Sequence, residues 1–228
     1  MKRRARGFFV TGTDTAVGKT IVACALLHAF AASGRSVIGM KPVAAGREDG
    51  HFHDVNALIG ASTRHAPEAL VNPYAFEPAI APHIAAARAG VDISVKKIEM
   101  AYAALSTMAD IVVVEGTGGY LIPLTENKTS ADMALALALP VVLVVGMRLG
   151  CLNHALLTQR AIAADGLVLA GWVANCFAPG MPALAENIAA LEQRLNAPLL
   201  GSVPYSPDPD AKALSLSLSV APLLQARP

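Results

Sequence analysis

The sequence predicts an α/β fold in three layers, a mostly parallel central sheet flanked by helices, within one domain over residues 1–228. Short apolar runs rich in β-branched residues alternate along the chain with longer helical patterns. The runs are continuously apolar, as strands buried on both faces are. No internal repeat or Gly/Ser-rich linker divides the chain, so we expect a single unit with right-handed crossovers.

Six apolar runs are the expected strands. They cover residues 8–11, 36–40, 111–115, 141–145, 168–174 and 199–203. The uncharged stretch from Met133 to Met147 is shorter than the roughly 18 residues that span a bilayer, and Pro140 interrupts it. We therefore expect a helix end, a break and a buried strand there, and no membrane partner.

Helical patterns fill the intervals between these strands. They cover residues 19–32, 94–108, 152–165 and 182–195. Gly34 is suited to end the first helix, and Ser94 is suited to cap the start of the second.

Two stretches are less regular. Residues 46–90 contain four prolines and are expected to form loops and short helices over the active site. The tail, residues 206–228, is poorly specified. Its Leu–Ser alternation from Leu214 to Val220 has a period of two, which fits either an edge strand or an extended segment.

Composition narrows the classes of function. Hydrophobic residues make up 54% of the chain and charged residues only 15%, which excludes disorder as the dominant state. The formal net charge is +1, so there is no electrostatic case for a nucleic-acid partner or an acidic membrane.

The three cysteines, Cys24, Cys151 and Cys176, are odd in number and at least 25 residues apart. Neither a disulfide framework nor a metal ribbon fits this spacing. The apolar run after the basic N-terminus is far shorter than the core of a signal peptide. We therefore expect reduced thiols in a cytoplasmic protein.

The most informative stretch is residues 12–20, Gly-Thr-Asp-Thr-Ala-Val-Gly-Lys-Thr, between the first strand and the first helix. Glycines let backbone N–H groups converge on phosphate oxygens, and the helix N-terminus adds further unpaired N–H groups. Lys19 can reach the β- and γ-phosphates, and the Thr20 hydroxyl suits Mg²⁺. The pattern predicts a P-loop NTPase fold that binds ATP or GTP.

Phosphoryl transfer also needs hard oxygen ligands for Mg²⁺ and extra positive charge. Glu115 ends a buried strand just before Gly116-Thr117-Gly118-Gly119, and is a candidate second ligand. Asp54 lies where a loop enters a helix, so it is either a metal ligand or an ordinary helix cap. Lys41 ends the second strand, at the sheet edge where ligands bind.

Further blocks follow the phosphate loop in order. They are Lys41-Pro42-Val43, Asn72-Pro73-Tyr74, Pro82-His83-Ile84, Val114-Glu115-Gly116, residues 149–155, residues 171–175 and residues 201–204. Together with the loop they resemble the dethiobiotin synthetase family, over about residues 7–205.

The resemblance implies a ligase that joins 7,8-diaminononanoate and CO2 (or bicarbonate) at the expense of ATP, with Mg²⁺ as cofactor. One amine becomes a carbamate, whose oxygen attacks the γ-phosphate to give a carbamic–phosphoric anhydride. The second amine then closes the cyclic urea and expels phosphate. Bringing an anionic carbamate to a triphosphate requires cations, which Lys19, Lys41 and Mg²⁺ would supply.

The resemblance also assigns residues. It makes Lys41 and Lys19 catalytic, gives Mg²⁺ to Thr20, Asp54 and Glu115, and places the Asn175 side chain on the adenine. The implied nucleotide contacts are Thr13, Asp14, Thr15, Ala16, Val17, Gly18, Lys19, Thr20, Ile21, Asp54, Glu115, Gly116, Thr117, Gly118, Asn175, Cys176, Val203, Pro204 and Tyr205. The implied substrate contacts are Thr15, Lys41, Ala45, Gly118, Leu149, Gly150, Cys151, Leu152 and Asn153.

Gly150 and Cys151 are expected to open a helix whose free N–H groups suit an anion. In the family this segment serves the substrate carboxylate across a homodimer interface. Asn153 also fits an ordinary helix cap. Two departures affect the substrate side: Ala16 stands where many members carry Glu, and Ala45 stands where Ser is common. In the tail, Asp208 and Asp210 are candidates to read the base.

Alternative functions remain open at this stage. A switch ATPase of the partitioning group usually carries a second lysine early in the loop, where this chain has Thr13, Asp14 and Thr15. A small-molecule kinase usually adds an arginine-rich lid, whereas Arg148, Arg160 and Arg194 are scattered. His51-Phe52-His53-Asp54 also resembles a transition-metal cluster, although we interpret it as a polar loop that carries Asp54.

Overall fold

The computed structural model describes residues 5–225 and contains a six-stranded, all-parallel sheet. The strands, in spatial order, are β2 (Val37–Met40), β5 (Ile111–Gly119), β1 (Arg6–Gly12), β6 (Val141–Gly146), β7 (Leu169–Asn175) and β8 (Leu199–Val203). All six expected strands are present, with ends shifted by up to four residues. β1 lies between β5 and β6, so the chain order changes direction at β1, which is where parallel α/β sheets bind ligands.

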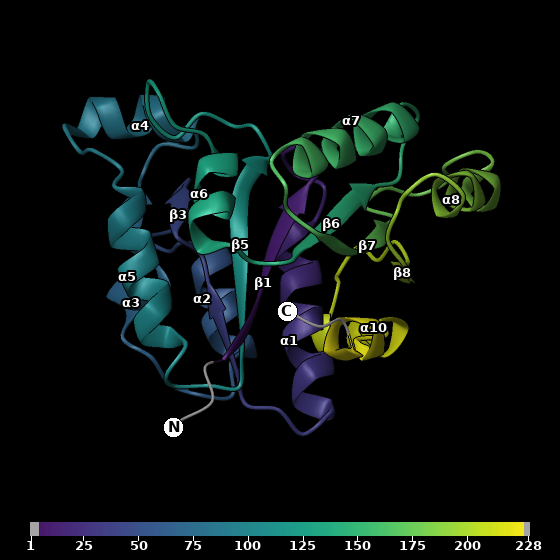
Figure 1. The fold of residues 1–228 in the computed structure, drawn as a ribbon, viewed down its shortest axis with the longest axis horizontal. Helices are drawn as coiled ribbons and strands as arrows, with labels where there is room; N and C mark the ends of the chain where they lie inside the picture. Colours follow the sequence, from purple (N-terminus) through teal and green to yellow (C-terminus); the bar gives the residue numbers. More distant parts are fainter. Residues whose placement is uncertain (1–4, 226–228) are drawn as a thin grey trace.

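Helices cover both faces of this sheet (Figure 1). One face carries α1 (Lys19–Ala32), α2 (His53–Ala61), α9 (Ala211–Leu214) and α10 (Ala221–Gln225). The other face carries α5 (Val95–Leu105), α6 (Ser130–Leu137), α7 (Cys151–Ala164) and α8 (Leu184–Glu192). The predicted three-layer α/β fold is confirmed.

Alternate residues of each strand pack against the helices on opposite faces of the sheet. In β5, Ile111 and Val113 face the α1 side, and Val112 and Val114 face the α5 side. Because both faces of these strands are buried, their central residues are apolar, which is why the runs were continuous in the sequence.

The first helix shows how local sequence sets the boundaries. α1 spans Lys19–Ala32 as expected, and Gly34 after it adopts a left-handed φ of +81°. Ser94 caps α5 and accepts a hydrogen bond from the Lys97 N–H at 3.3 Å, again as expected.

Two short strands were not expected. β3 (Val43–Ala45) and β4 (Tyr74–Phe76) pair in parallel as a separate two-stranded sheet. This pair lies within the proline-rich region, together with α2, α3 (Glu68–Val71) and α4 (Pro82–Ala89). Three residues are too few for a periodic pattern to identify.

The expectation of an edge strand or extended segment at residues 214–220 was wrong. Leu214 ends α9, a 3₁₀ turn covers Ser215–Ser217, and α10 follows. Leu214 and Leu218, four residues apart, are buried against α1, while Leu216 between them is 90% exposed. The alternation with serine therefore did not reflect alternate burial.

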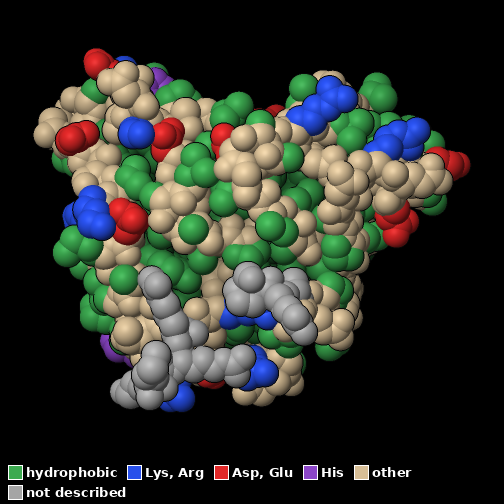
Figure 2. All heavy atoms as spheres, viewed as in Figure 1, with side chains coloured by type: hydrophobic (Ala, Val, Ile, Leu, Met, Phe, Trp, Pro, Cys, Tyr) green, Lys and Arg blue, Asp and Glu red, His purple; other side chains and the backbone are tan. Residues whose placement is uncertain are grey.

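The surface in Figure 2 carries basic and acidic side chains interspersed near its edges, with hydrophobic side chains between them. Within residues 5–225, no helix is both long and apolar enough to cross a bilayer.

Candidate active site

Strand register brings the predicted site residues together. In the parallel sheet, Met40 pairs with Val114 and Val10 pairs with Glu115. Lys41 therefore leaves β2 beside Glu115 of β5, and β1 runs into the phosphate loop on the other side of Glu115. Three chain segments far apart in the sequence thus place their charged residues at one edge of the sheet.

The phosphate loop turns sharply into α1. Gly18 has a φ of +85°, and a Cβ at this position would lie 2.1 Å from the Asn175 amide nitrogen. The loop is held from β7, because the Asn175 side-chain NH2 donates to the Val17 carbonyl at 2.8 Å. The Lys19 ammonium donates to the Asp14 carbonyl at 2.9 Å, so the lysine folds back over its own loop.

Lys41 lies at the centre of a buried ionic cluster. Its ammonium contacts Glu115 Oε1 and lies 2.8 Å from Asp54 Oδ2. The Thr20 hydroxyl donates to the same Glu115 oxygen at 2.9 Å. The Lys41 and Glu115 side chains are only 5% and 1% exposed, so water screens their charges little.

These environments shift the pKa values. Burial lowers the pKa of Lys19 to about 8, although Glu115 partly opposes it. Burial also disfavours the charge on Lys41, but the carboxylates of Glu115 and Asp54 outweigh it and raise its pKa. Lys41 therefore stays a cation, and Lys19 is the more easily deprotonated of the two.

The two carboxylates differ as well. Burial raises the pKa of Glu115, whereas for half-exposed Asp54 the attraction of Lys41 outweighs burial and lowers the pKa. Asp54 lies in the first turn of α2 but does not cap it, because Phe52 occupies the N-cap position without a side-chain bond. The cap interpretation of Asp54 is thus wrong.

The residues expected to hold Mg²⁺ fit a divalent cation. Glu115 Oε2 is buried and has no hydrogen-bond partner, which is costly unless another group satisfies it. Asp54 and Thr20 supply further hard oxygens beside it, the ligand type that Mg²⁺ prefers. By contrast, His51 and His53 are exposed, and among residues 5–225 no group of three His, Cys, Asp or Glu side chains is placed to hold a metal.

The end of β7 lies against the phosphate loop, and β8 pairs with β7 there. Asn175 pairs with Val203, and the Cys176 N–H donates to the Val203 carbonyl at 2.9 Å. Pro204 and Tyr205 are exposed just beyond. The Asn175 amide, assigned to the adenine by resemblance, contacts the phosphate loop here and is 3% exposed.

Residues 149–153 open α7 as expected. Gly150 precedes the helix with a φ of +96°, Cys151 is buried, and Leu149 is 96% exposed. Just before them, the Arg148 guanidinium pairs with the Asp14 carboxylate of the phosphate loop. The segment assigned to substrate is thus tied to the loop assigned to nucleotide.

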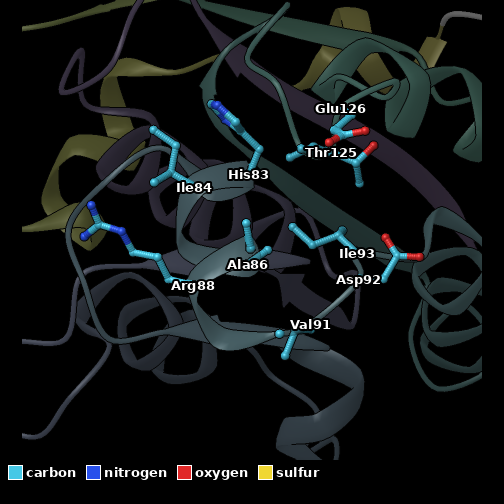
Figure 3. A pocket seen from close by; sticks show the side chains of 12 residues that line it. His83, Ile84, Ala86, Arg88, Val91, Asp92, Ile93, Thr125 and Glu126 are labelled. Carbon is cyan, nitrogen blue, oxygen red and sulfur yellow. The ribbon is translucent and has the colours of Figure 1, made fainter.

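Three cavities differ in their relation to this cluster. One of about 220 Å³ is lined by Ala44, Ala45, Phe52 and Asp54, and another of about 450 Å³ lies between α1, α2 and residues 209–211. The third, about 700 Å³, lies between α4 and residues 124–126 (Figure 3). None of the residues predicted for the site lines this third cavity.

Two residues of this region were not predicted to take part. Asn72 contacts the backbone of Lys41, and Arg148 contacts Asp14. Asn72 lies in one of the blocks that carried the resemblance, which was the available signal. Nothing in the sequence spacing pointed to Arg148.

Glu115 was expected to end its strand, but β5 continues to Gly119, so its carboxylate lies within the strand. The parallel sheet, the phosphate loop between β1 and α1, and this carboxylate define a P-loop NTPase. The MinD septum site-determining protein of Pyrococcus horikoshii, solved with Mg-ADP, shares the fold with a TM-score of 0.57 at 15% identity, over 97% of this chain and 90% of that one. The MinD of Aquifex aeolicus also gives 0.57 at 16% identity, over 89% of this chain and 83% of that one.

Sequence comparison identifies the family. A family model described as an AAA domain matches residues 6–213. The chain is 56% identical over 216 residues to the ATP-dependent dethiobiotin synthetase BioD of Nitrosospira multiformis, which covers 95% of this chain and 96% of that protein. The protein of the same name from Aromatoleum aromaticum is 52% identical over 219 residues, covering 93% and 97%. The chain belongs to the ATP-dependent dethiobiotin synthetase family.

Proposed function

We propose that this chain forms dethiobiotin from 7,8-diaminononanoate, CO2 and ATP. One amine of the substrate attacks CO2 to give a carbamate and releases a proton. A carbamate oxygen then attacks the γ-phosphorus, forming a carbamic–phosphoric anhydride and releasing ADP. The second amine attacks the carbonyl carbon, closes the five-membered urea and expels phosphate.

The observation that carries this proposal is the buried cluster of Lys41, Glu115 and Thr20 beside the phosphate loop. Two anions must meet in this reaction, so their repulsion is a large part of the barrier. Lys41 is held as a cation next to the loop and can receive the carbamate. Lys19 can turn from the Asp14 carbonyl to the phosphates.

Thr20, Asp54 and Glu115 would hold Mg²⁺, which when bound neutralises charge on the phosphate oxygens. The orphaned Glu115 oxygen supports this assignment. The remaining nucleotide contacts follow the assignment by resemblance, from Thr13 to Ile21 and at the ends of β5, β7 and β8.

On the substrate side, Thr15, Lys41, Ala45 and Gly118 would contact the diamine from one subunit. Residues 149–153 of a second copy would bind the carboxylate, so the active form would be a homodimer. The Leu149 side chain is 96% exposed in the single chain, and an exposed apolar side chain in this segment supports an interface there. Because the reaction consumes ATP, we place the protein in the cytoplasm.

The test is a product assay. Purified protein is incubated with 7,8-diaminononanoate, bicarbonate, Mg²⁺ and ATP, and the cyclic urea is sought by mass spectrometry. We expect product only when all four components are present. ATP hydrolysis that persists without the diamine, with no urea formed, would instead support a switch ATPase.

A further inference from the structure

Lys41 sits where the chain leaves the main sheet. β2 ends at Met40, and β3 begins the small second sheet only three residues later, at Val43. Lys41 therefore belongs to neither sheet, and no strand ladder fixes its backbone. Its ammonium must nevertheless stay between Glu115 and Asp54 at the end of a long, flexible side chain.

Hydrogen bonds with residues 71 and 72 hold the Lys41 backbone in place of a strand ladder. The Lys41 N–H donates to the Val71 carbonyl at 2.9 Å. The Asn72 side-chain NH2 donates to the Lys41 carbonyl at 2.6 Å and to the Tyr74 carbonyl at 2.9 Å. Both polar groups of the Lys41 backbone are thus bonded to the end of α3.

The orientation of the Asn72 amide follows from its partners. Both are carbonyl oxygens, which only accept, so the NH2 group and not the amide oxygen must face them. Asn72 is itself only 9% exposed, so water cannot readily replace these bonds. An aspartate here would direct an acceptor at two carbonyl oxygens.

We propose that Asn72 is a positioning residue for the reaction: it fixes the backbone of Lys41 so that the ammonium points at the reacting oxygens. The inference rests on the proposed function, in which Lys41 receives the carbamate. Asn72 contacts the Lys41 backbone and acts only through it. Loss of the Asn72 hydrogen bonds lets the Lys41 backbone shift, and misplacement of a reacting group by about 1 Å can lower the rate about 100-fold.

The experiment compares Asn72→Ala and Asn72→Asp with the unaltered chain in the dethiobiotin assay. For both variants kcat is expected to fall about 10- to 100-fold, while KM for ATP stays within about twofold, because the phosphate loop is untouched. Asn72→Ser keeps one hydrogen-bond donor, so its kcat is expected to lie between that of the unaltered chain and that of these two variants. If Asn72→Ala does not fold, Asn72→Ser carries the comparison.

A double-mutant cycle separates positioning from general structural damage. Once Lys41 is alanine there is no ammonium to position, so adding Asn72→Ala should leave the residual single-turnover rate unchanged. An equal fold-loss in both backgrounds would overturn the proposal.

Ser106→Ala serves as the matched control, because this buried hydroxyl also donates to a backbone carbonyl, at 2.8 Å. Ser106 lies beside the start of β1, where its own carbonyl accepts from the Ala5 N–H, whereas Lys41 follows the opposite, carboxyl end of β2. It should leave kcat unchanged, and a similar fall in kcat with Ser106→Ala would also overturn the proposal. Absence of product with the unaltered chain would contradict the proposed function itself.

Discussion

The two carboxylate oxygens of Glu115 lie in different environments. One carboxylate oxygen accepts from Thr20 and contacts Lys41, while the other is buried with no partner. The sequence placed this glutamate at a strand end and predicted a metal ligand. It did not predict the contact with Lys41, 74 residues away, because that contact depends on β2 and β5 being neighbours in the sheet.

Glu115→Gln tests the metal assignment. The amide keeps the shape of the side chain but removes its charge, so the half-saturating Mg²⁺ concentration should rise about tenfold or more. The measurement is initial rate against Mg²⁺ concentration at fixed ATP. A Mg²⁺ titration identical to that of the unaltered chain would remove Glu115 from the metal site.

Lys41→Ala tests the charge assignment. Because the proposed role of Lys41 is to stabilise charge that develops during phosphoryl transfer, kcat should fall about 100-fold or more, while ATP binding measured by calorimetry changes little. Weak ATP binding combined with normal turnover at saturation would contradict this role.

Among the elements, α6 begins with a cap that the sequence interpretation did not include. The Asp132 carboxylate accepts from the Thr129 N–H at 2.8 Å and from the Thr129 hydroxyl at 3.0 Å. The Thr129 N–H bond is the main cause that holds the pKa of Asp132 below its ordinary value. Its contribution to stability is therefore complete above about pH 4 and is lost as the pH falls through the lowered pKa.

Asp132→Ala should lower the free energy of unfolding by about 1 kcal/mol at pH 7. Urea titrations at pH 7 and at low pH measure this difference, which should shrink in acid. Lys128→Ala is the control, because it removes only an exposed ion pair with Asp132 and should cost less than about 0.5 kcal/mol. An Asp132→Ala cost that does not change with pH would contradict the assignment.

The C-terminal helices give a matched pair of leucines. Leu218→Ala removes a side chain buried against α1 and should cost about 2–3 kcal/mol. Leu216→Ala, two residues earlier and 90% exposed, should change stability by less than about 0.5 kcal/mol. Equal effects in urea unfolding would support the extended segment that the alternation had suggested.

These elements explain what the sequence could predict. Strands buried on both faces leave continuous apolar runs, so β1, β2 and β5 to β8 were found. The strands β3 and β4 were not predicted, because three residues are too few to show a periodic pattern. Their pairing also joins Val43 to Tyr74, which are 31 positions apart in the sequence. The prediction for residues 214–220 was wrong because packing against α1 determines which of these residues are buried. The regular spacing of the serines does not correspond to one exposed face.

At the scale of the whole molecule, the proposed function requires a second copy of the chain to complete the site. Residues 149–153 open α7 and are tied to the phosphate loop through Arg148 and Asp14. Leu149 points its apolar side chain almost fully into solvent, at 96% exposure. An isolated exposed leucine needs no explanation, but one inside the segment assigned to the partner's substrate favours an interface.

Sedimentation should therefore give twice the chain mass of 23.5 kDa. Leu149→Glu places a charge in the proposed interface, so it should shift the protein to monomers and abolish turnover while each chain still binds ATP. Leu216→Glu, another exposed leucine outside the segment, should leave both mass and turnover unchanged. A fully active monomer would show that one chain holds the whole site, and residues 149–153 would then have to act within their own subunit, beside Asp14.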